Sequence, residues 1–249
     1  MAPRYALVTG ASSGIGAATA RALASEGCSV WITYSSNRSE ADATARDCIE
    51  NGAPDAQVTK LDLRRPDSIA ALIADIDRAW GKLTVLVNNA AICNYTKYDE
   101  IGIDEWDETM ETNARGTFLL SRAALPLLRK GEGDRSIINV ASVAGQIGSV
   151  TTGMHYAASK GAILAITRSL ARALATEGIR VNAVTPGPIL SSITEKLAPT
   201  ERISLAAVIP LGRFGSPEEA AWIIAAAASP RASFVTGATY DVNGGVRID

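Results

Sequence analysis

The stretch Tyr5-Ala6-Leu7-Val8-Thr9-Gly10-Ala11-Ser12-Ser13-Gly14-Ile15-Gly16 joins a short apolar run to small, helix-compatible residues that continue to Glu26. This order predicts a strand, a glycine-rich turn and a helix. Gly10 permits a tight turn, Gly14 lets the backbone approach a ligand, and Gly16 lets the helix pack closely on the strand. Because the N–H groups that open the helix face an anion, a diphosphate is the expected ligand. A plain glycine-rich turn is the alternative, since the first two glycines are four residues apart rather than the two of the common dinucleotide fingerprint.

Outward from this turn, strand-like and helix-like segments alternate along the chain. The expected strands are Tyr5–Thr9, Ser29–Tyr34, Ala56–Leu63, Leu83–Val87, Ser136–Ala141, Ile179–Thr185 and Thr239–Val242. The expected helices are Ala17–Glu26, Arg38–Asn51, Pro66–Trp80, Ile103–Arg129, one around Tyr156 that runs to about Thr176, and one that Ser216 and Pro217 open. Right-handed crossovers between such units give a parallel sheet with helices on both faces. We therefore predict an α/β fold, with residues 1–249 forming a single Rossmann-type doubly wound domain and a mostly seven-stranded parallel sheet.

The end of the second expected strand bears on the choice of nucleotide. In a dinucleotide fold, an Asp or Glu at this position binds the ribose 2′-hydroxyl of NAD. Here the strand continues as Tyr34-Ser35-Ser36-Asn37-Arg38, and no carboxylate occurs before Glu40. Ser35, Ser36 and Arg38 can instead receive a 2′-phosphate through charge-assisted hydrogen bonds, which predicts NADP(H) over NAD(H). The alternative is that Arg38 is a solvated residue that opens the next helix.

The segment Met154-His155-Tyr156-Ala157-Ala158-Ser159-Lys160 carries a candidate acid/base pair. On a helix, Tyr156 and Lys160 project from one face about one turn apart. We expect the lysine ammonium to favour the phenolate and lower the pKa of Tyr156 from its ordinary value of about 10. Ser142, at the end of a strand, can donate a hydrogen bond to a substrate oxygen, and Asn113 in the middle of a helix requires a role for its side chain. For His155 we expect contact with substrate or solvent and no catalysis.

Composition excludes several classes of protein. The 249 residues carry a formal charge of −2 and no basic excess, so neither nucleic acid nor an anionic membrane is an expected partner. The longest small-apolar run, Ala220–Ala228, is too short to cross a bilayer. Three dispersed cysteines and a single histidine offer no metal site and fit reduced thiols, so we expect a cytoplasmic protein with no metal.

Taken together, these motifs resemble the short-chain dehydrogenase/reductase family over nearly the whole chain. The matching segments are Thr9–Gly16, Asn88-Asn89-Ala90-Ala91 (with Ala91 in place of the usual glycine), Pro186-Gly187, Gly212–Glu219, Thr236-Gly237 and Asp241–Gly245. The resemblance assigns the catalytic tetrad to Asn113, Ser142, Tyr156 and Lys160. With the local chemistry above, the predicted cofactor site comprises Gly10, Ser12, Ser13, Gly14, Ile15, Gly16, Ser35, Arg38, Asp62, Leu63, Asn89, Ala90, Ala91, Tyr156, Lys160, Pro186, Gly187 and Ile189.

The function that this resemblance implies is NADP(H)-dependent reduction of a ketone or 3-oxoacyl carbonyl, with Tyr156 as the general acid. It also implies that Lys160 binds the nicotinamide ribose, that Asn113 anchors a water linked to Lys160, and that the protein is a homotetramer. An alcohol or sugar dehydrogenase that works oxidatively with NAD(P) is the alternative, and a non-catalytic dinucleotide sensor is a remote one. The pocket is expected to involve Tyr95, residues 143–148, Met154 and a lid at 189–208. The small-molecule substrate, and whether it arrives on an acyl carrier protein, stay open.

Overall fold

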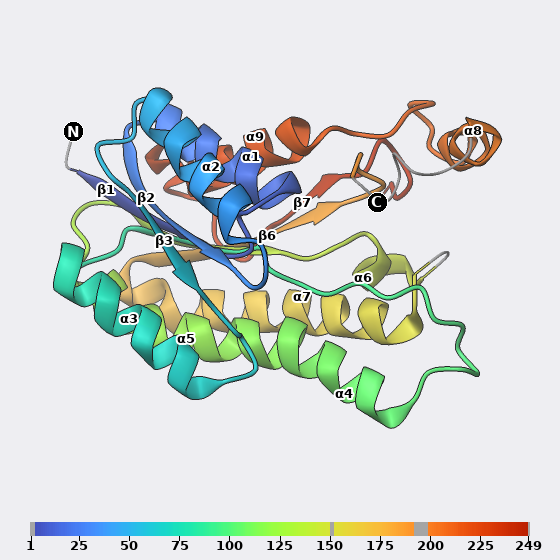
Figure 1. The fold of residues 1–249 in the computed structure, drawn as a ribbon, viewed down its shortest axis with the longest axis horizontal. Coiled ribbons are helices and arrows are strands. Elements are labelled where there is room, and N and C mark those ends of the chain that lie inside the picture. The colour runs from blue at the N-terminus through green and yellow to red at the C-terminus, as the bar shows by residue number, and fades with distance from the viewer. Residues whose placement is uncertain (1–2, 150–151, 192–198, 249) are drawn as a thin grey trace.

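The computed structural model of the chain describes residues 3–149, 152–191 and 199–248. Within these residues, seven strands form a parallel sheet in the order β3-β2-β1-β4-β5-β6-β7 (Figure 1). The strands are β1 (Arg4–Val8), β2 (Cys28–Tyr34), β3 (Ala56–Lys60), β4 (Val85–Asn88), β5 (Arg135–Val140), β6 (Ile179–Pro186) and β7 (Thr239–Val242). The doubly wound α/β fold predicted from the sequence is confirmed.

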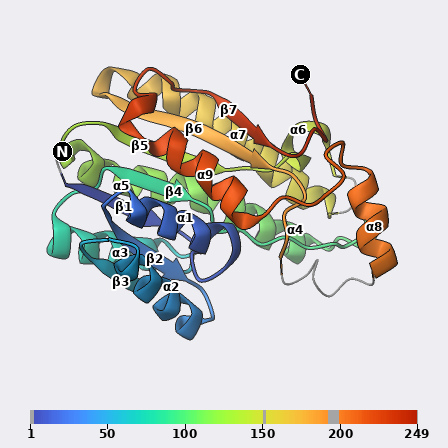
Figure 2. The same cartoon turned by 90° about the horizontal axis from the view of Figure 1, so that it is seen from above.

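Helices cover both faces of this sheet, with α1, α2 and α9 on one side and α3, α5 and α7 on the other (Figures 1 and 2). The α-helices are α1 (Gly14–Ser25), α2 (Arg38–Glu50), α3 (Pro66–Trp80), α4 (Ile103–Met110), α5 (Gly116–Lys130), α6 (Ala144–Ile147), α7 (Met154–Leu174), α8 (Pro199–Ala207) and α9 (Pro217–Ala228). Shorter turns are the π-helical η1 (Glu111–Arg115) and the 3-10 segments η2 (Ala175–Glu177) and η4 (Pro230–Ala232). None of the described helices has the length and apolar character needed to cross a membrane.

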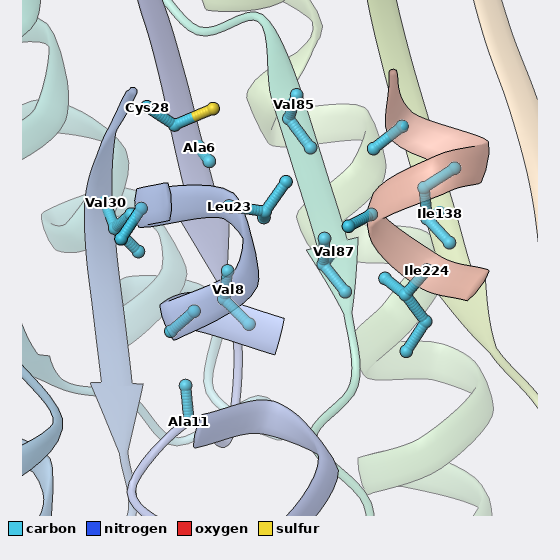
Figure 3. Close-up of a cluster of buried hydrophobic side chains, with 14 of the residues drawn as sticks. Ala6, Val8, Ala11, Leu23, Cys28, Val30, Val85, Val87, Ile138 and Ile224 are labelled. Atoms are coloured by element: carbon cyan, nitrogen blue, oxygen red, sulfur yellow. The ribbon is translucent and has the colours of Figure 1, made fainter. Parts of the chain in front are cut away.

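The core consists of two apolar clusters separated by the sheet. Because side chains alternate along a strand, Ala6 and Val8 of β1 face the layer of α1 and α9, whereas Leu7 between them faces α3 and α5. Figure 3 shows the first cluster, in which Leu23 of α1 and Ile224 of α9 meet strand residues. Both clusters are buried, and the central strands β1, β2, β4, β5 and β6 are largely buried on both faces, as in other parallel sheets, whereas the edge strands β3 and β7 are partly exposed.

The strand order determines where a ligand can bind. β1 has β2 on one side and β4 on the other, and the chain reverses its direction of winding between β1 and β4. In open parallel sheets, ligands bind beyond the carboxyl ends of the strands at such a switch point. The turn after β1 and the Asn88-Asn89 segment at the end of β4 both lie there.

Most boundaries differ from the sequence prediction by one to three residues, and the differences in two elements have a clear physical reason. The third strand was expected to reach Leu63, but β3 ends at Lys60. The reason is that its neighbour β2 ends at Tyr34. The Tyr34 carbonyl accepts the last hydrogen bond between the two strands, from Leu61 N (2.9 Å), and the next N–H, that of Asp62, donates to Ser68 Oγ instead (3.0 Å). The helix expected over Ile103–Arg129 is divided into α4, η1 and α5, because the backbone widens to a π-helical turn around Asn113.

The predicted lid is described only in part. Residues 192–198 lie outside the described residues, and Pro199–Ala207 form α8. In both views α8 lies beyond the end of the sheet, away from the two helical layers (Figures 1 and 2). The closing motion that we expect of this segment stays a prediction.

Candidate active site

A cavity of about 560 Å³ opens at the carboxyl edge of β1, β2, β3 and β4. Eight residues of the predicted cofactor site line it: Gly10, Ser12, Ser35, Asp62, Leu63, Asn89, Ala90 and Ala91. The remaining lining residues are Thr33, Tyr34, Lys60, Leu61, Arg64, Ile92, Glu108 and Thr112. The structure therefore brings the ends of four strands to one concave surface.

The glycine turn at one wall of this cavity leaves no room for larger residues. Gly10 has a φ of +61°, and a Cβ on it would lie 2.8 Å from Ala90 Cα. A Cβ on Gly16 would lie 2.3 Å from Gly10 O and 2.5 Å from Asn89 Nδ2. The first turn of α1 contains no acidic residue, and Ser13 at its N-cap forms no side-chain capping bond. Its N–H groups are thus available to an anion such as a diphosphate.

The segment after β4 is hydrogen-bonded to this glycine turn. Asn89 Nδ2 donates to Thr9 O (2.9 Å) and Gly10 O (3.1 Å), and Thr9 Oγ1 accepts from the N–H groups of Asn89 and Ala90 (2.9 and 3.0 Å). Asn88 points into the core, where its Nδ2 donates to Ser121 Oγ and Asn139 Oδ1 (2.9 and 2.8 Å). Ala91 lines the cavity with the rest of the segment. These bonds hold the rim rigid.

Charged residues line the part of the cavity that follows β3. Asp62 accepts bonds from the Arg64 guanidinium and backbone N–H, which hold the pKa of its carboxyl below the usual value despite partial burial. Arg64 Nη1 also lies 2.7 Å from Glu108 Oε1. Arg38, predicted to bind a 2′-phosphate, is not among the lining residues; its side chain is 70% exposed, and its Nε lies 3.4 Å from Asp42 Oδ2.

Other predicted cofactor residues do not line this cavity. Ile15 packs on the core cluster of α1. Pro186 O accepts from Val143 N (3.0 Å), and Gly187 N donates to Val242 O (2.9 Å), so this turn lies between the end of β5 and the end of β7. Ile189 lines a separate cavity of about 510 Å³ near the C-terminal residues.

The side chain of Asn113, in the middle of a helical segment, connects the loop after β4 to α7. It is fully buried, and its amide spans the loop after β4: Oδ1 accepts from Ile92 N, and Nδ2 donates to Ile92 O (both 2.9 Å). Nδ2 also donates to Ser159 Oγ on α7 (3.0 Å), which in turn donates to Tyr156 O (2.7 Å). The π-helical turn around Asn113 thus connects the rim of the cavity to the helix that carries Tyr156 and Lys160.

Replacing Asn113 with Ala should lower the free energy of unfolding by about 2–3 kcal/mol, because both backbone groups of Ile92 and the Ser159 hydroxyl lose a buried partner. Asn51→Ala, which removes one exposed bond to Asp47 O, is the matched control, and we expect it to cost less than about 1 kcal/mol. Urea denaturation at equilibrium measures both. Equal losses in the two variants would contradict the bridging role of Asn113.

Tyr156, Lys160 and Ser142 converge beyond the end of β5. Lys160 is buried, its Nζ donates to Val140 O (2.8 Å), and it lies 5.6 Å from the centre of the Tyr156 ring. Burial lowers the pKa of Lys160 to about 8. Ser142 hydrogen-bonds the Tyr156 side chain, and Ser142 Oγ accepts from Ala144 N (3.1 Å).

The expected lowering of the Tyr156 pKa is wrong. Burial raises the pKa of its phenol above the ordinary value, and the hydrogen bond from Ser142 opposes this only partly. The expected lowering by Lys160 does not appear, because its ammonium is directed to a backbone carbonyl and is itself costly to keep charged where it is buried. Tyr156 is therefore protonated near neutral pH, which suits a group that donates a proton.

His155 also departs from expectation. It is fully buried rather than in contact with substrate or solvent, and neither ring nitrogen forms a hydrogen bond within the described residues, although Nε2 lies 3.3 Å from Glu105 Oε1. The same Glu105 oxygen accepts from Asn94 Nδ2 (2.9 Å) and Thr96 Oγ1 (2.6 Å). Glu105 thus joins the loop after the cavity rim to the first turn of α7. Nothing in the local sequence indicates this contact, since its members are about 50 residues apart in the chain.

Of the residues expected to shape a substrate pocket, Tyr95 and Met154 are both more than half exposed. Cys93 is one of the three cysteines expected to be reduced thiols. It lies near enough to act electrostatically on Tyr156 and Lys160, and it hydrogen-bonds with Tyr95. Burial raises the pKa of the Cys93 thiol, so it is neutral near pH 7. It adds a small polarisable group near the Tyr156 phenol.

Several known proteins are similar to this chain over nearly its whole length. The family described as "Enoyl-(Acyl carrier protein) reductase" matches residues 10–247. The chain is 38% identical over 244 residues to the 3-oxoacyl-[acyl-carrier-protein] reductase FabG of Staphylococcus aureus, covering 98% of each chain. It is 39% identical to FabG of Vibrio cholerae, covering 98% of this chain and 97% of the relative. The corresponding reductase of Synechocystis is 37% identical, over 98% of this chain and 96% of the relative. The chain therefore belongs to the short-chain dehydrogenase/reductase family and is an oxidoreductase.

Proposed function

We propose that this chain reduces the carbonyl of a 3-oxoacyl thioester or a related ketone to an alcohol, with NADP(H) as the cofactor. The observation that supports this best is the convergence of Ser142 with Tyr156 and Lys160 on a helix that Asn113 connects to Ile92, a residue that lines the cavity at the glycine turn. Similarity to 3-oxoacyl-[acyl-carrier-protein] reductases over nearly the whole chain points to the substrate class.

Each catalytic side chain has a role that its surroundings support. A bound reduced nicotinamide would supply hydride to the carbonyl carbon. Tyr156, which burial keeps protonated, donates its proton to the carbonyl oxygen as negative charge develops there. Ser142 donates a second hydrogen bond to that oxygen and holds it in place. Two hydroxyl groups on one oxygen suit a carbonyl, and we therefore favour reduction of C=O over reduction of a carbon–carbon double bond.

Lys160 stabilises the phenolate that remains after Tyr156 has given up its proton. Its ammonium, now bonded to Val140 O, is one helical turn away on the same face of α7. Asn113, whose side-chain amide donates to Ile92 O and Ser159 Oγ, positions this pair, and the water expected to link Lys160 to solvent stays a prediction. The cofactor residues at the turn after β1 and at the end of β4 orient the dinucleotide by their rigid backbone.

The preference for NADP(H) is testable by steady-state kinetics. We expect kcat/KM to be at least about tenfold higher with NADPH than with NADH, because a 2′-phosphate gains charge-assisted hydrogen bonds near Ser35 and finds no carboxylate at the end of β2. Initial rates at saturating carbonyl substrate measure the ratio. A preference for NADH would contradict the assignment.

A substrate panel tests the reaction itself. Purified protein and NADPH are incubated with acetoacetyl thioesters, simple ketones, diketones and crotonyl thioesters, and the nicotinamide absorbance is followed. Turnover of the oxo compounds but not of the crotonyl thioester supports the proposal. Turnover of alcohols or sugars with NADP⁺ alone would favour the oxidative dehydrogenase, and binding of dinucleotide without turnover of any compound would favour the sensor.

We further propose that the protein is a homotetramer. Trp222 on α9 and Phe234 after η4 are largely exposed, and β7 is an edge strand of the sheet, so this side of the molecule presents apolar surface that a second copy can cover. Phe118 on α5 is also partly exposed on the opposite helical layer. Light scattering after size exclusion gives the mass directly, and a monomer at micromolar concentration would contradict the proposal.

A further inference from the structure

The end of β3 places a basic side chain in the nucleotide cavity that the sequence motifs did not indicate. Lys60 is the last residue of β3 and pairs in register with Tyr34, the last residue of β2. Side chains two residues apart on a strand share a face. Val58 and Tyr34 pack on the cluster beneath α1 and α2, so Lys60 belongs to the same side of the sheet. α2 lies over this end of the strands (Figures 1 and 2).

This position coincides with the region where the adenosine ribose is expected. Lys60 lines the same cavity as Ser12, Ser35 and Tyr34, that is, the glycine turn and the end of β2. The end of β2 is where a dinucleotide fold meets the 2′ position of the ribose. A lysine with four methylene groups and an exposed ammonium, projecting from the neighbouring strand, faces this position from the side.

The other basic residues of this region are already paired. Arg64 bonds to Asp62 and Glu108 (3.2 and 2.7 Å), and Arg38 lies against Asp42 on its own helix. Among the described residues, the Lys60 side chain has neither an ion pair nor a hydrogen bond, although it lines the cavity. Arg64, Asp62 and Glu108 together leave the cavity one negative charge in excess, and Lys60 restores neutrality. An anionic ligand group therefore gains most from Lys60.

We infer that Lys60 is the principal cation that recognises the 2′-phosphate of the cofactor, with Ser35 as its hydrogen-bonding neighbour. This assignment rests on the proposed use of NADP(H). On this assignment, the residue at the end of β3 determines the choice between NADP(H) and NAD(H). Arg38 contributes less to binding of the 2′-phosphate, since its side chain must leave Asp42 to reach that group.

Two adenosine fragments isolate this contact from the rest of the cofactor. Adenosine 2′,5′-bisphosphate and adenosine 5′-monophosphate differ only in the 2′-phosphate, and titration calorimetry gives the affinity of each for the full-length protein. In Lys60→Ala we expect binding of the bisphosphate to weaken by about 10- to 100-fold, as for loss of a charged hydrogen bond, and binding of the monophosphate to change by less than about twofold. Arg38→Ala should have a smaller effect on the same ratio.

Lys130→Ala is the control, because it removes the same charge from the C-terminal end of α5, away from the cavity. It should leave both affinities unchanged. Lys60→Glu tests the sign: the carboxylate repels the phosphate and can accept the ribose 2′-hydroxyl, so the ratio of NADPH to NADH affinity should fall below that of Lys60→Ala.

Failure of this inference and failure of the cofactor proposal give different results. If wild-type protein prefers the bisphosphate and Lys60→Ala retains that preference, Lys60 is not the phosphate ligand, although the protein still uses NADP(H). If wild-type protein binds the two fragments equally, the cofactor proposal is overturned and this inference with it. Melting curves of each variant verify that the exposed substitutions leave the fold intact.

Discussion

Replacing Tyr156 with Phe should reduce kcat by about 10²–10⁴-fold, the usual contribution of a positioned general acid. The substitution removes only the hydroxyl and keeps the ring, so the contact with Lys160 and the packing of α7 should persist. Because burial raises the pKa of the phenol, the hydroxyl is protonated at neutral pH, and the variant loses a neutral group that can donate a proton rather than an anion. The KM for NADPH should change little, since the glycine turn and the rim after β4 are untouched.

The measurement is steady-state turnover of an acetoacetyl thioester together with a cofactor titration by nicotinamide fluorescence. Tyr98→Phe is the control, because Tyr98 is 77% exposed and lies outside the site. Near-normal turnover in the Tyr156 variant would remove the basis of the proposed mechanism. Loss of cofactor binding alongside turnover would instead assign Tyr156 a binding role.

Replacing Lys160 with Met should affect activity and stability in opposite directions. Without the ammonium, the phenolate of Tyr156 loses its nearest cation, and kcat/KM should fall by about 10²-fold or more. In the cofactor-free protein, however, the charged lysine is buried with one carbonyl partner, which is why its pKa falls to about 8. A methionine of similar length removes this penalty, so the free energy of unfolding should rise by about 1–2 kcal/mol.

The pH dependence of that gain follows from the two pKa values of Lys160, about 8 in the folded chain and 10.5 ordinarily. Between these values the unfolded chain retains a proton that the folded chain has released, so wild-type stability gains with rising pH relative to the variant. The advantage of Lys160→Met is therefore full below pH 8 and disappears as the pH approaches 10.5. Urea denaturation at several pH values measures it, with Lys130→Met as an exposed control. An equal gain at all pH values would show that packing, not charge, is responsible.

Much of the site could be predicted because its elements are local in the chain. The glycine turn, the apolar run of β1 and the pairing of Tyr156 with Lys160 each occupy fewer than a dozen consecutive residues. Backbone sterics and helix periodicity act over that range, so residue type and spacing suffice. The position of Asp62, Asn89 and Ser142 at strand ends followed from the same logic, because parallel strands end at one edge of the sheet.

The contacts that tune the site could not be predicted in this way. Asn113 meets Ile92 and Ser159 across 21 and 46 residues of sequence, and Glu105 meets His155 across 50. No periodicity connects such positions. The orientation of Arg38 toward Asp42 rather than into the cavity depends on which acidic neighbour is nearer, which the strand-end pattern does not specify.

By itself, the sequence determined the doubly wound fold, the family, and which residues are candidates for the acid/base chemistry, since these depend on hydrophobic alternation and on side chains close in the chain. The tertiary structure alone decided how those groups ionise and that Lys60, besides the ion-paired Arg64, lines the cavity at the ends of β1 to β4. Burial raises the pKa of Tyr156 and lowers that of Lys160, because the surrounding layers enclose Lys160 and partly enclose Tyr156. Lys60 reaches the cavity because β3 pairs with β2 in a register that aligns it with Tyr34. Desolvation and strand register arise only when distant segments pack together, and neither is written in any short stretch of the chain.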